Sequence, residues 1–416
     1  MTQKQRETES IKPGALSDVR VLDLANPMGI YCTKLFADLG ADVIRVEPSG
    51  GDPVRNLGPF FKDDVHPEKS LYWFHMNTSK RSITLNLETS DGVSIFKRLA
   101  ARSDMIVETF KPGYLDSIGL GYAVLSTLNP GLILVSITGF GQTGPWKDYK
   151  APDIVGLAVG GVLHISGWPD LPPTTLGGSQ AYHQTSAQAA AGALVALWHS
   201  TMTGEGQHVD VSMQQIVPLS HQTNTLSYEK VGRMSQRGGY QHKMSPGIGY
   251  GVMACSDGYV DIRIQRPRWD DLVKWLDSEG MAGDLKEEKW QDPSYRVKPE
   301  AIEHAMEIVG AFLKKRTKRE ASEEGQRRRL IIMPVNTAKE VAADPQLNAR
   351  NFFVDVEHPE LGTSLKYLGV PYQLSETPAR ISRRAPLIGE HNWEIYGQEL
   401  GYSKDELVQL KQMGII

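Results

Sequence analysis

The first half of the chain alternates short apolar runs with segments of helical spacing. Runs rich in Val, Ile and Leu predict buried strands, and apolar positions at three- and four-residue intervals predict the helices that pack on them. The predicted strands cover residues 16–24, 43–46, 83–87, 105–108 and 132–137. The predicted helices cover residues 30–39 and 89–101 and a short segment that ends near Pro130.

The order of these elements predicts a largely parallel, doubly wound α/β sheet. A helix between two strands returns the chain for another parallel strand, and such crossovers cover both faces of a sheet. Gly40 stands where a glycine usually ends a helix, and Thr89 or Ser90 can cap the helix that follows. Residues 16–46 therefore form a first compact βαβ unit.

The second half of the chain changes character. A helix over 186–199 and a tight turn at 203–206 lead to a strand over 208–213, and the polar, glycine-containing stretch 222–246 marks a crossing between domains. Residues 250–330 follow as a smaller α+β unit. Its clearest elements are a strand over 259–264 and a helix over 269–276.

Composition places the chain among ordinary globular proteins. A length of 416 residues corresponds to about two or three structural units. The 45 basic and 49 acidic residues give a net charge of -4, which argues against a nucleic-acid partner. Cys32 and Cys255 form no CxxC pair or disulfide framework, so we expect a reducing, cytoplasmic setting. The first ten residues lack an apolar core, and the longest uncharged stretch is broken by glycines, so no membrane association is expected.

Several common motifs are absent from the sequence. The first predicted strand is followed by Asn26-Pro27-Met28-Gly29 instead of GxGxxG, which excludes a nicotinamide dehydrogenase. No GxxxxGK[ST] loop is present, which excludes a P-loop NTPase. There is no HExxH sequence, and the 11 histidines have no ligand spacing, so we expect no metal site.

Candidate ligand contacts follow the predicted strands. Phe110 and Lys111 lie after a strand, at the carboxyl edge where doubly wound sheets bind ligands; they could contact an adenine and a phosphate, or be a core ring and a solvated charge. Lys80 and Arg81 precede a predicted strand, where they could bind a ligand phosphate or be a solvent-exposed pair of charges. The loop from Gly139 to Pro145 allows close backbone approach by a ligand, or is only a flexible turn.

Asp153 lies in an apolar segment. Its charge needs a partner there, and a helix N-cap is the simplest role.

Seven blocks in one order along the chain give these candidates a context. They are residues 39–52, 77–87, 104–122, 128–145, 193–213, 344–353 and 384–395. Together they resemble the family III CoA-transferases, which include formyl-CoA transferase and carnitine CoA-transferase, with alpha-methylacyl-CoA racemase as a relative. The resemblance covers nearly the whole chain from Leu16 onward.

The resemblance implies a Rossmann-like large domain built from both chain ends, a smaller inserted α+β domain and an interlocked dimer. The expected bounds are a disordered tail over 1–15, the large domain over 16–225 and 331–416, and the small domain over 226–330. It implies no permanently bound cofactor, with coenzyme A thioesters as substrates. The implied CoA contacts are Thr109, Phe110, Lys111, Lys80, Arg81 and Lys150, and the implied cleft-loop glycines are Gly139, Gly141, Gly247 and Gly249.

The match breaks at the catalytic group. In the active transferases an Asp carboxylate attacks the acyl-CoA, and its acyl derivatives store the thioester energy between half-reactions. Tyr182 stands at the corresponding position, and no Asp or Glu occurs between Leu171 and Gly204. Pro48 and Ser117 replace basic CoA-contacting residues of formyl-CoA transferase, and Pro27 replaces a Gln near its thioester. The resemblance therefore implies no catalytic residue on this chain, with Asp153 as a weak alternative.

Three interpretations follow. The favoured one is a subunit paired with a homologous chain that carries the Asp, as in two-subunit members such as succinyl-CoA:(R)-benzylsuccinate CoA-transferase, with an aromatic or dicarboxylic acid as acceptor and succinyl-CoA as donor. The second is a self-sufficient enzyme, either a transferase with a displaced carboxylate or a racemase using His164 or His183 with Asp153. The third is a regulatory CoA-binding protein.

Overall fold

The computed structural model describes residues 12–239 and 250–416, which form two compact units. The large unit comprises the residues up to Gly160, Gly177–Ser220 and Pro345–Ile416. The small unit comprises Gly161–Leu176 and His221–Asp344. Both ends of the chain therefore contribute to the large unit. The N-terminal tail expected over 1–15 falls mostly outside the described residues.

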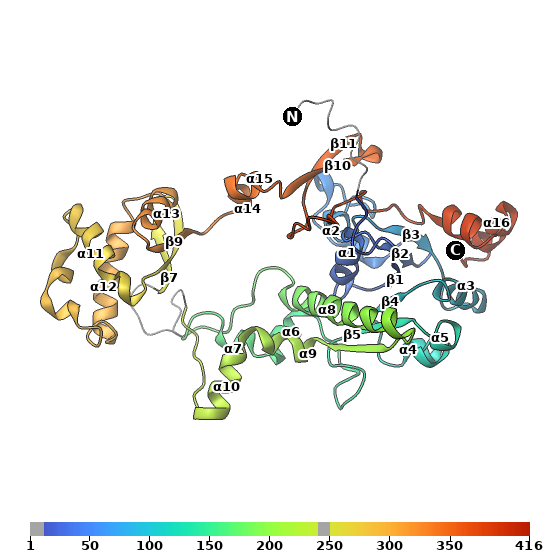
Figure 1. The fold of residues 1–416 in the computed structure, drawn as a ribbon, viewed down its shortest axis with the longest axis horizontal. Helices are drawn as coiled ribbons and strands as arrows, with labels where there is room; N and C mark the ends of the chain where they lie inside the picture. The colour runs from blue at the N-terminus through green and yellow to red at the C-terminus, as the bar shows by residue number, and fades with distance from the viewer. Residues whose placement is uncertain (1–11, 240–249) are drawn as a thin grey trace. The chain divides into compact units, whose positions relative to one another are not determined.

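A six-stranded parallel sheet forms the centre of the large unit, in the order β3-β2-β1-β4-β5-β6 (Figure 1). Its strands are β1 (Arg20–Leu24), β2 (Asp42–Glu47), β3 (Arg81–Thr84), β4 (Met105–Glu108), β5 (Ile133–Thr138) and β6 (His208–Ser212). All residues of β4 and β5 are buried, because helices cover both faces of the sheet. The predicted α/β class with a parallel sheet is confirmed.

Two sets of helices cover the sheet. On one face, α1 (Ile30–Asp38) contacts β1 and β2, and α8 (Gln180–Thr203) contacts β5 and β6. On the other face, α3 (Ser90–Ala100) and α5 (Tyr122–Leu128) share a core with strand residues such as Leu22, Ile44 and Ile106. Each fully buried aliphatic side chain of this kind stabilises the fold by about 1.5–3 kcal/mol. The predicted cap of α3 is also confirmed, because the Thr89 hydroxyl accepts the Gly92 N–H.

Several elements differ from their expected bounds by one or two residues, and three differ by more. Strand β1 begins at Arg20, not at residue 16, because residues 15–18 form a turn. Strand β3 ends at Thr84, not at residue 87, because its partner β2 ends at Glu47, opposite Thr84. The Leu85 N–H still donates to the Glu47 carbonyl at 2.7 Å, and the chain leaves the sheet after it. Helix α8 runs from Gln180 to Thr203, ten residues more than the 14 expected, and Gly204 closes it in the left-handed conformation at φ 77°.

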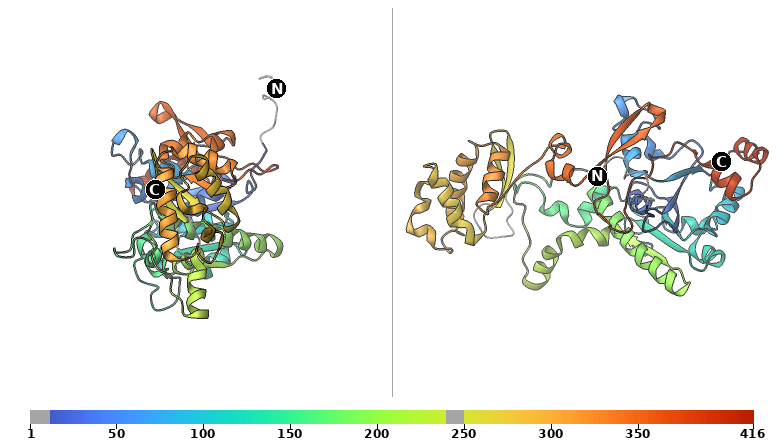
Figure 2. Two further views of the ribbon diagram at one scale, coloured as in Figure 1. Left: turned by 90° about the vertical axis from the view of Figure 1, so that its left-hand side faces the viewer. Right: turned by 45° about the horizontal axis from the view of Figure 1, so that its top comes forward.

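The C-terminal segment of the large unit returns to the sheet. A hairpin of β10 (Phe353–His358) and β11 (Thr363–Leu368) precedes a π-helical turn over Trp393–Glu399 and helix α16 (Lys404–Gln412). Ile395 and Tyr396 are fully buried in the core that α3 and α5 share. The right-hand view of Figure 2 shows the red C-terminal helix on the opposite side of this unit from α8, drawn in green. The remaining helices of this unit are α2 (Leu71–Met76), α4 (Tyr114–Ser117), α6 (Asp153–Val159), α9 (Met213–Ile216) and α15 (Pro345–Ala349).

The small unit has its own core. Three antiparallel strands, β7 (Tyr250–Cys255), β8 (Gly258–Arg263) and β9 (Ile331–Pro334), pair in the order β7-β8-β9. Trp275, Trp290 and Phe312 are fully buried in the cluster behind this sheet. The helices of this unit are α7 (Val162–Ile165), α10 (Gln222–Val231), α11 (Trp269–Ser278), α12 (Pro299–Leu313), α13 (Lys318–Arg327) and α14 (Ala338–Ala342).

Candidate active site

A cavity of about 610 Å³ lies at the carboxyl ends of β1, β2, β3 and β4 in the large unit. This is the edge at which doubly wound sheets bind ligands, and the strand order reverses between β1 and β4. We call this cavity the sheet-edge pocket. Its lining residues are Leu24, Asn26, Pro27, Val46, Glu47, Pro48, Ser49, Asp52, Pro53, Val54, Leu57, Leu85, Asn86, Leu87, Glu88, Thr109, Phe110 and Tyr114.

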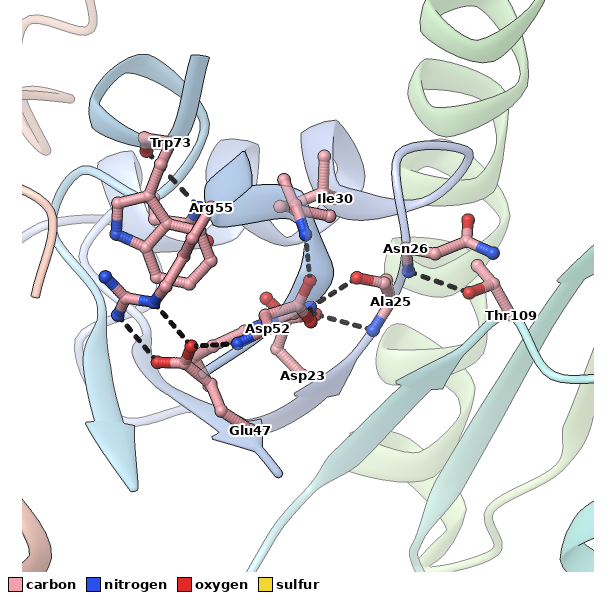
Figure 3. Close-up of polar contacts among 12 residues, drawn as sticks. Asp23, Ala25, Asn26, Ile30, Glu47, Asp52, Arg55, Trp73 and Thr109 are labelled. Atoms are coloured by element: carbon pink, nitrogen blue, oxygen red, sulfur yellow. Dashed lines mark hydrogen bonds and ion pairs between the residues drawn. The ribbon is translucent and has the colours of Figure 1, made fainter. Parts of the chain in front are cut away.

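Two of the expected CoA contacts, Thr109 and Phe110, line this pocket. The Asn26 N–H donates to the Thr109 hydroxyl at 2.8 Å and so ties the end of β1 to the end of β4 (Figure 3). A Cβ on Gly29 would lie only 2.9 Å from the Thr109 methyl carbon, so the glycine permits this close approach. The Phe110 ring packs at 4.7 Å, centroid to centroid, on Tyr114. The two rings, tilted by 41° to each other, form an aromatic part of the lining.

Buried ion pairs hold the β2 side of the pocket. The Arg55 guanidinium donates to both Glu47 carboxylate oxygens, at 2.6 and 2.8 Å, and its carbon lies 3.7 Å from the centre of the Trp73 ring (Figure 3). The Asp52 N–H donates to Glu47 at 2.8 Å, and the Asp52 carboxylate pairs with Arg45. The two carboxylates are therefore fixed by internal partners.

Glu108 ends β4, directly before Thr109. It is 4% exposed, and its burial raises the pKa of the carboxyl to about 7, although hydrogen bonds from the Ser136 hydroxyl and the Phe110 N–H oppose this effect. The Ser136 hydroxyl also lies 2.9 Å from His208 Nε2. Glu108 is thus a buried group that changes protonation near neutral pH beside the pocket wall.

The expected basic contacts lie elsewhere. The Lys80 ammonium is fully buried and donates to Asp23 at 2.9 Å, Thr33 at 2.8 Å and Asn77 at 3.0 Å, so its hydrogens are used within the protein. Arg81 begins β3, at the edge of the sheet opposite the pocket, and pairs with Asp42 and Glu399. Neither side chain lines the pocket. Burial lowers the pKa of Lys80 to about 8, while Asp23 opposes that shift.

Lys111 and Lys150 are exposed and lie outside the pocket lining. The loop after β5 brings Gly139 against Ala151, where a Cβ on the glycine would lie 2.1 Å from the alanine methyl. The Gly141 N–H donates to the Thr138 hydroxyl at 2.9 Å. The next amide, that of Gln142, donates to Asp210, so these two N–H groups already have partners. Gly247 and Gly249 lie outside the described residues.

Tyr182 is the third residue of α8, and its N–H donates to an Asp153 carboxylate oxygen at 2.9 Å. Asp153 is itself the first residue of α6. Its carboxylate therefore caps the N-terminus of α8 rather than that of its own helix. The Tyr182 hydroxyl lies 3.4 Å from the Ala151 carbonyl oxygen, and burial, followed by the Asp153 charge, raises the pKa of its phenol.

Four further half-buried rings surround this position: Tyr31 on α1, Tyr72 and His75 on α2, and His183 on α8. We call them, with Tyr182, the ring cluster. Tyr31 packs edge-on against His183 with 4.9 Å between ring centroids. Burial raises the pKa of Tyr72 to about 12, and Tyr182 and Asp153 add to the effect. Burial lowers the pKa of His75 to about 4, with further contributions from Lys34 and His183, and also lowers the pKa of His183.

The ring cluster therefore presents neutral groups at pH 7. Its phenol hydroxyls and imidazole nitrogens can donate hydrogen bonds without carrying charge. The sequence analysis did not identify Tyr31, Tyr72 or His75. No local motif marks them, because only the packing of α1 and α2 in the large unit brings them beside His183 and Tyr182.

Two further properties bear on the kind of site. Within residues 12–239 and 250–416, no three His, Cys, Asp or Glu side chains gather in a way that could hold a metal ion. No helix in the same ranges has the length and apolar character needed to cross a membrane.

Comparison with known proteins gives these observations a family context. The chain is 33% identical to the succinyl-CoA:(R)-benzylsuccinate CoA-transferase subunit BbsE of Thauera aromatica, over 96% of this chain and 98% of that protein. It is 34% identical to the succinyl-CoA–D-citramalate CoA-transferase of Chloroflexus aurantiacus, over 97% and 98% of the two chains.

Among solved structures, a CAIB/BAIF family protein from Brucella suis matches with a TM-score of 0.84 and 30% identity, covering 93% of this chain and all of that one. The family model described as CoA-transferase family III matches residues 16–392. The sheet-edge pocket and the ring cluster thus belong to a member of CoA-transferase family III.

Proposed function

We propose that this chain is the subunit without a nucleophile in a two-subunit CoA-transferase. The complex moves CoA from an acyl-CoA donor, succinyl-CoA, to an aromatic or dicarboxylic acid. A homologous partner chain supplies the Asp that is acylated. This chain completes the interlocked dimer and shapes the shared cleft.

The observation that carries this proposal is Tyr182 at the start of α8. A carboxylate attacks a thioester to give an acyl anhydride and free CoA thiolate, and the thiolate then attacks to give an enzyme thioester and free acid. Each derivative remains reactive enough for the next exchange. The Tyr182 phenol is protonated at pH 7, and its acyl product would be a less reactive ester. The nearest carboxylate along α6, that of Asp153, is engaged as a cap.

The outer face of α8 supports a partner chain. Val195, Trp198 and Met202 follow helical spacing and are 70%, 69% and 66% exposed in the single chain. A stripe of large apolar side chains on one helix is typical of a surface that another protein covers. The relative BbsE is itself named as a subunit of a CoA-transferase.

We place CoA at the sheet-edge pocket. Thr109 and Phe110 contact it from the lining, and Lys111 and Lys150 contribute from outside it. CoA thioesters act as substrates rather than as a permanently bound group. Succinyl-CoA as donor is supported by the names of the two relatives, which both include succinyl-CoA.

Intact-mass analysis with succinyl-CoA tests the proposal. The chain alone should gain no covalent acyl or CoA adduct, and in the complex the adduct should appear only on the partner. A homodimer of this chain that exchanges thioesters at ordinary enzymatic speed would overturn the proposal.

A second candidate function rests on the contact between Asp153 and Tyr182. Because an Asp153 oxygen lies 2.9 Å from the Tyr182 N–H, a carboxylate is present beside the expected nucleophile position. Asp153 could then act as a displaced nucleophile in a self-sufficient transferase. Digestion of the treated chain distinguishes the two candidates, because an acyl or CoA adduct on the peptide containing Asp153 supports only the second.

A further inference from the structure

The charges around the sheet-edge pocket are unusual for a nucleotide site. Its charged lining residues are Glu47, Asp52 and Glu88, and no Lys or Arg belongs to the lining among the described residues. CoA carries a diphosphate and a 3′-phosphate, and sites that recognise phosphates normally supply Arg, Lys or free backbone N–H groups. This pocket presents carboxylates instead.

The nearest buried cations are already paired. Arg45 donates to Asp23 at 2.8 Å and pairs with Asp52, and Arg55 is held by Glu47 and by Glu68 at 2.6 Å. The Lys80 ammonium donates its hydrogen bonds to Asp23, Thr33 and Asn77. Moving any of these cations to a phosphate would leave a carboxylate buried without its partner, which is strongly unfavourable.

The uncharged part of the lining fits a flat ring. Phe110 and Tyr114 supply aromatic surface, and Pro27, Pro48 and Leu85 supply aliphatic surface. A volume of about 610 Å³ lies within the range of about 300–1,000 Å³ that is usual for small-molecule sites. Stacking of a base on an aromatic side chain strengthens binding without any charge.

We propose that the sheet-edge pocket recognises the uncharged adenosine part of a CoA thioester and gives no recognition to its 3′-phosphate. The 3′-phosphate stays solvated outside the lining, because the lining has no cation to replace its water; the exposed Lys111 and Lys150, which lie outside the lining, are assigned to the diphosphate. This inference rests on the proposed function only in taking CoA as the ligand. It adds that the chain accepts 3′-dephospho-CoA as readily as CoA.

Calorimetric titration of the full-length chain with CoA and with 3′-dephospho-CoA tests this inference. The two dissociation constants should agree within about threefold, whereas a charge-assisted phosphate contact would favour CoA by about tenfold or more. A preference for CoA of that size overturns the inference but leaves the proposed CoA site intact. Absence of binding by both ligands overturns the CoA site itself, so the two failures are distinguishable.

A pair of variants sharpens the test. Pro48→Arg adds a cation to the lining and should create a preference for CoA of about tenfold over 3′-dephospho-CoA, while the matched control Pro48→Gln should create none. Phe110→Ala should weaken the binding of both ligands equally, raising each dissociation constant by about tenfold. If Pro48→Arg does not fold, Ser49→Arg places the same charge on the next lining residue. If the added arginine changes the dissociation constants of CoA and 3′-dephospho-CoA by the same factor, the 3′-phosphate does not lie beside the pocket lining and the inference is overturned.

Discussion

The sheet-edge pocket and the ring cluster belong to the same large unit but hold their polar groups in opposite ways. In the pocket wall, Glu47 and Asp52 are each matched by a buried arginine and by backbone N–H groups. In the ring cluster, the side chains of Tyr31, Tyr72, His75 and His183 form no hydrogen bond with any described residue.

The polar side chains of the pocket wall have partners within the described part of the protein, whereas most of those in the ring cluster do not. Half-buried polar groups without partners are costly unless water or a ligand satisfies them. The ion pairs make the pocket wall rigid without any ligand, whereas the ring cluster depends on groups that come from outside it. The large unit thus combines a pocket whose wall is held by internal ion pairs with a set of neutral hydrogen-bonding rings around Tyr182.

The largest expected effect comes from placing a carboxylate at position 182 in the ring cluster. If loss of the nucleophile alone separates this chain from an active one, Tyr182→Asp should form a covalent adduct with succinyl-CoA where the wild-type chain forms none. Intact mass before and after addition of succinyl-CoA measures it. Tyr182→Asn is the matched control, because it has nearly the same shape without the charge. Absence of an adduct on a folded Tyr182→Asp chain that still binds CoA would show that more than the nucleophile has been lost.

Substitutions in the pocket wall should lower the free energy of unfolding more than substitutions in the ring cluster. Arg55→Met leaves the buried Glu47 carboxylate without its main partner, and removal of one member of a buried pair costs about 3–5 kcal/mol. Urea unfolding of the large unit measures the loss. The control is Lys12→Met, which breaks an exposed ion pair with Glu376 and should cost less than about 1 kcal/mol. Equal losses would contradict the role assigned to the buried network.

The two regions also differ in how far the sequence could predict them. Strand 105–108 was predicted to the residue, because a strand buried on both faces is a continuous apolar run between polar boundaries. Thr109 and Phe110 followed from that strand and from the family resemblance, and both line the pocket.

Features that depend on distant partners could not be predicted in this way. The sequence suggested that the Lys80 ammonium could bind a phosphate. In the structure it is buried and paired with Asp23, which lies 57 residues earlier in the chain. Tyr31 and His75 join the ring cluster through helix packing that no local spacing encodes. The domain bounds, the interlocked dimer and the catalytic role of the partner stay predictions.

The stability contributions of the pocket wall and of the ring cluster should depend on pH in opposite directions. Glu108 beside the pocket has a folded pKa of about 7, above its usual value of 4.5. Below pH 4.5 the carboxyl is protonated in both states; between pH 4.5 and 7 the unfolded state loses its proton first, so stability falls as pH rises. The total loss is about 3 kcal/mol. Glu108→Gln should therefore be more stable than wild type in urea at pH 8 and equal to it near pH 4.5. The same difference at both pH values would exclude titration of Glu108 as the cause.

In the ring cluster the sign is reversed. His75 has a folded pKa of about 4, below its usual value of 6.5. Above pH 6.5 the imidazole is neutral in both states; as pH falls from 6.5 to 4 the unfolded state binds the proton first, so stability is lost toward acid. Because the side chain is partly solvated, we expect a loss of about 1–2 kcal/mol. His75→Phe should remove this acid-side loss, measured by urea unfolding at pH 7 and pH 4.5. A steeper loss in the variant would contradict the assignment.

The smallest expected effect is at Asp153, and it tests whether this carboxylate beside the ring cluster acts as a nucleophile. As a cap of α8, Asp153 contributes one charge-assisted hydrogen bond to the Tyr182 N–H, so Asp153→Asn should lower stability by only about 1 kcal/mol. The amide oxygen of Asn still accepts that bond, and transfer by the complex with the partner should keep its rate. An amide cannot carry an acyl anhydride, so a displaced nucleophile would lose essentially all activity on the same substitution. Stability and rate measured on the same variant therefore separate a capping carboxylate from a catalytic one.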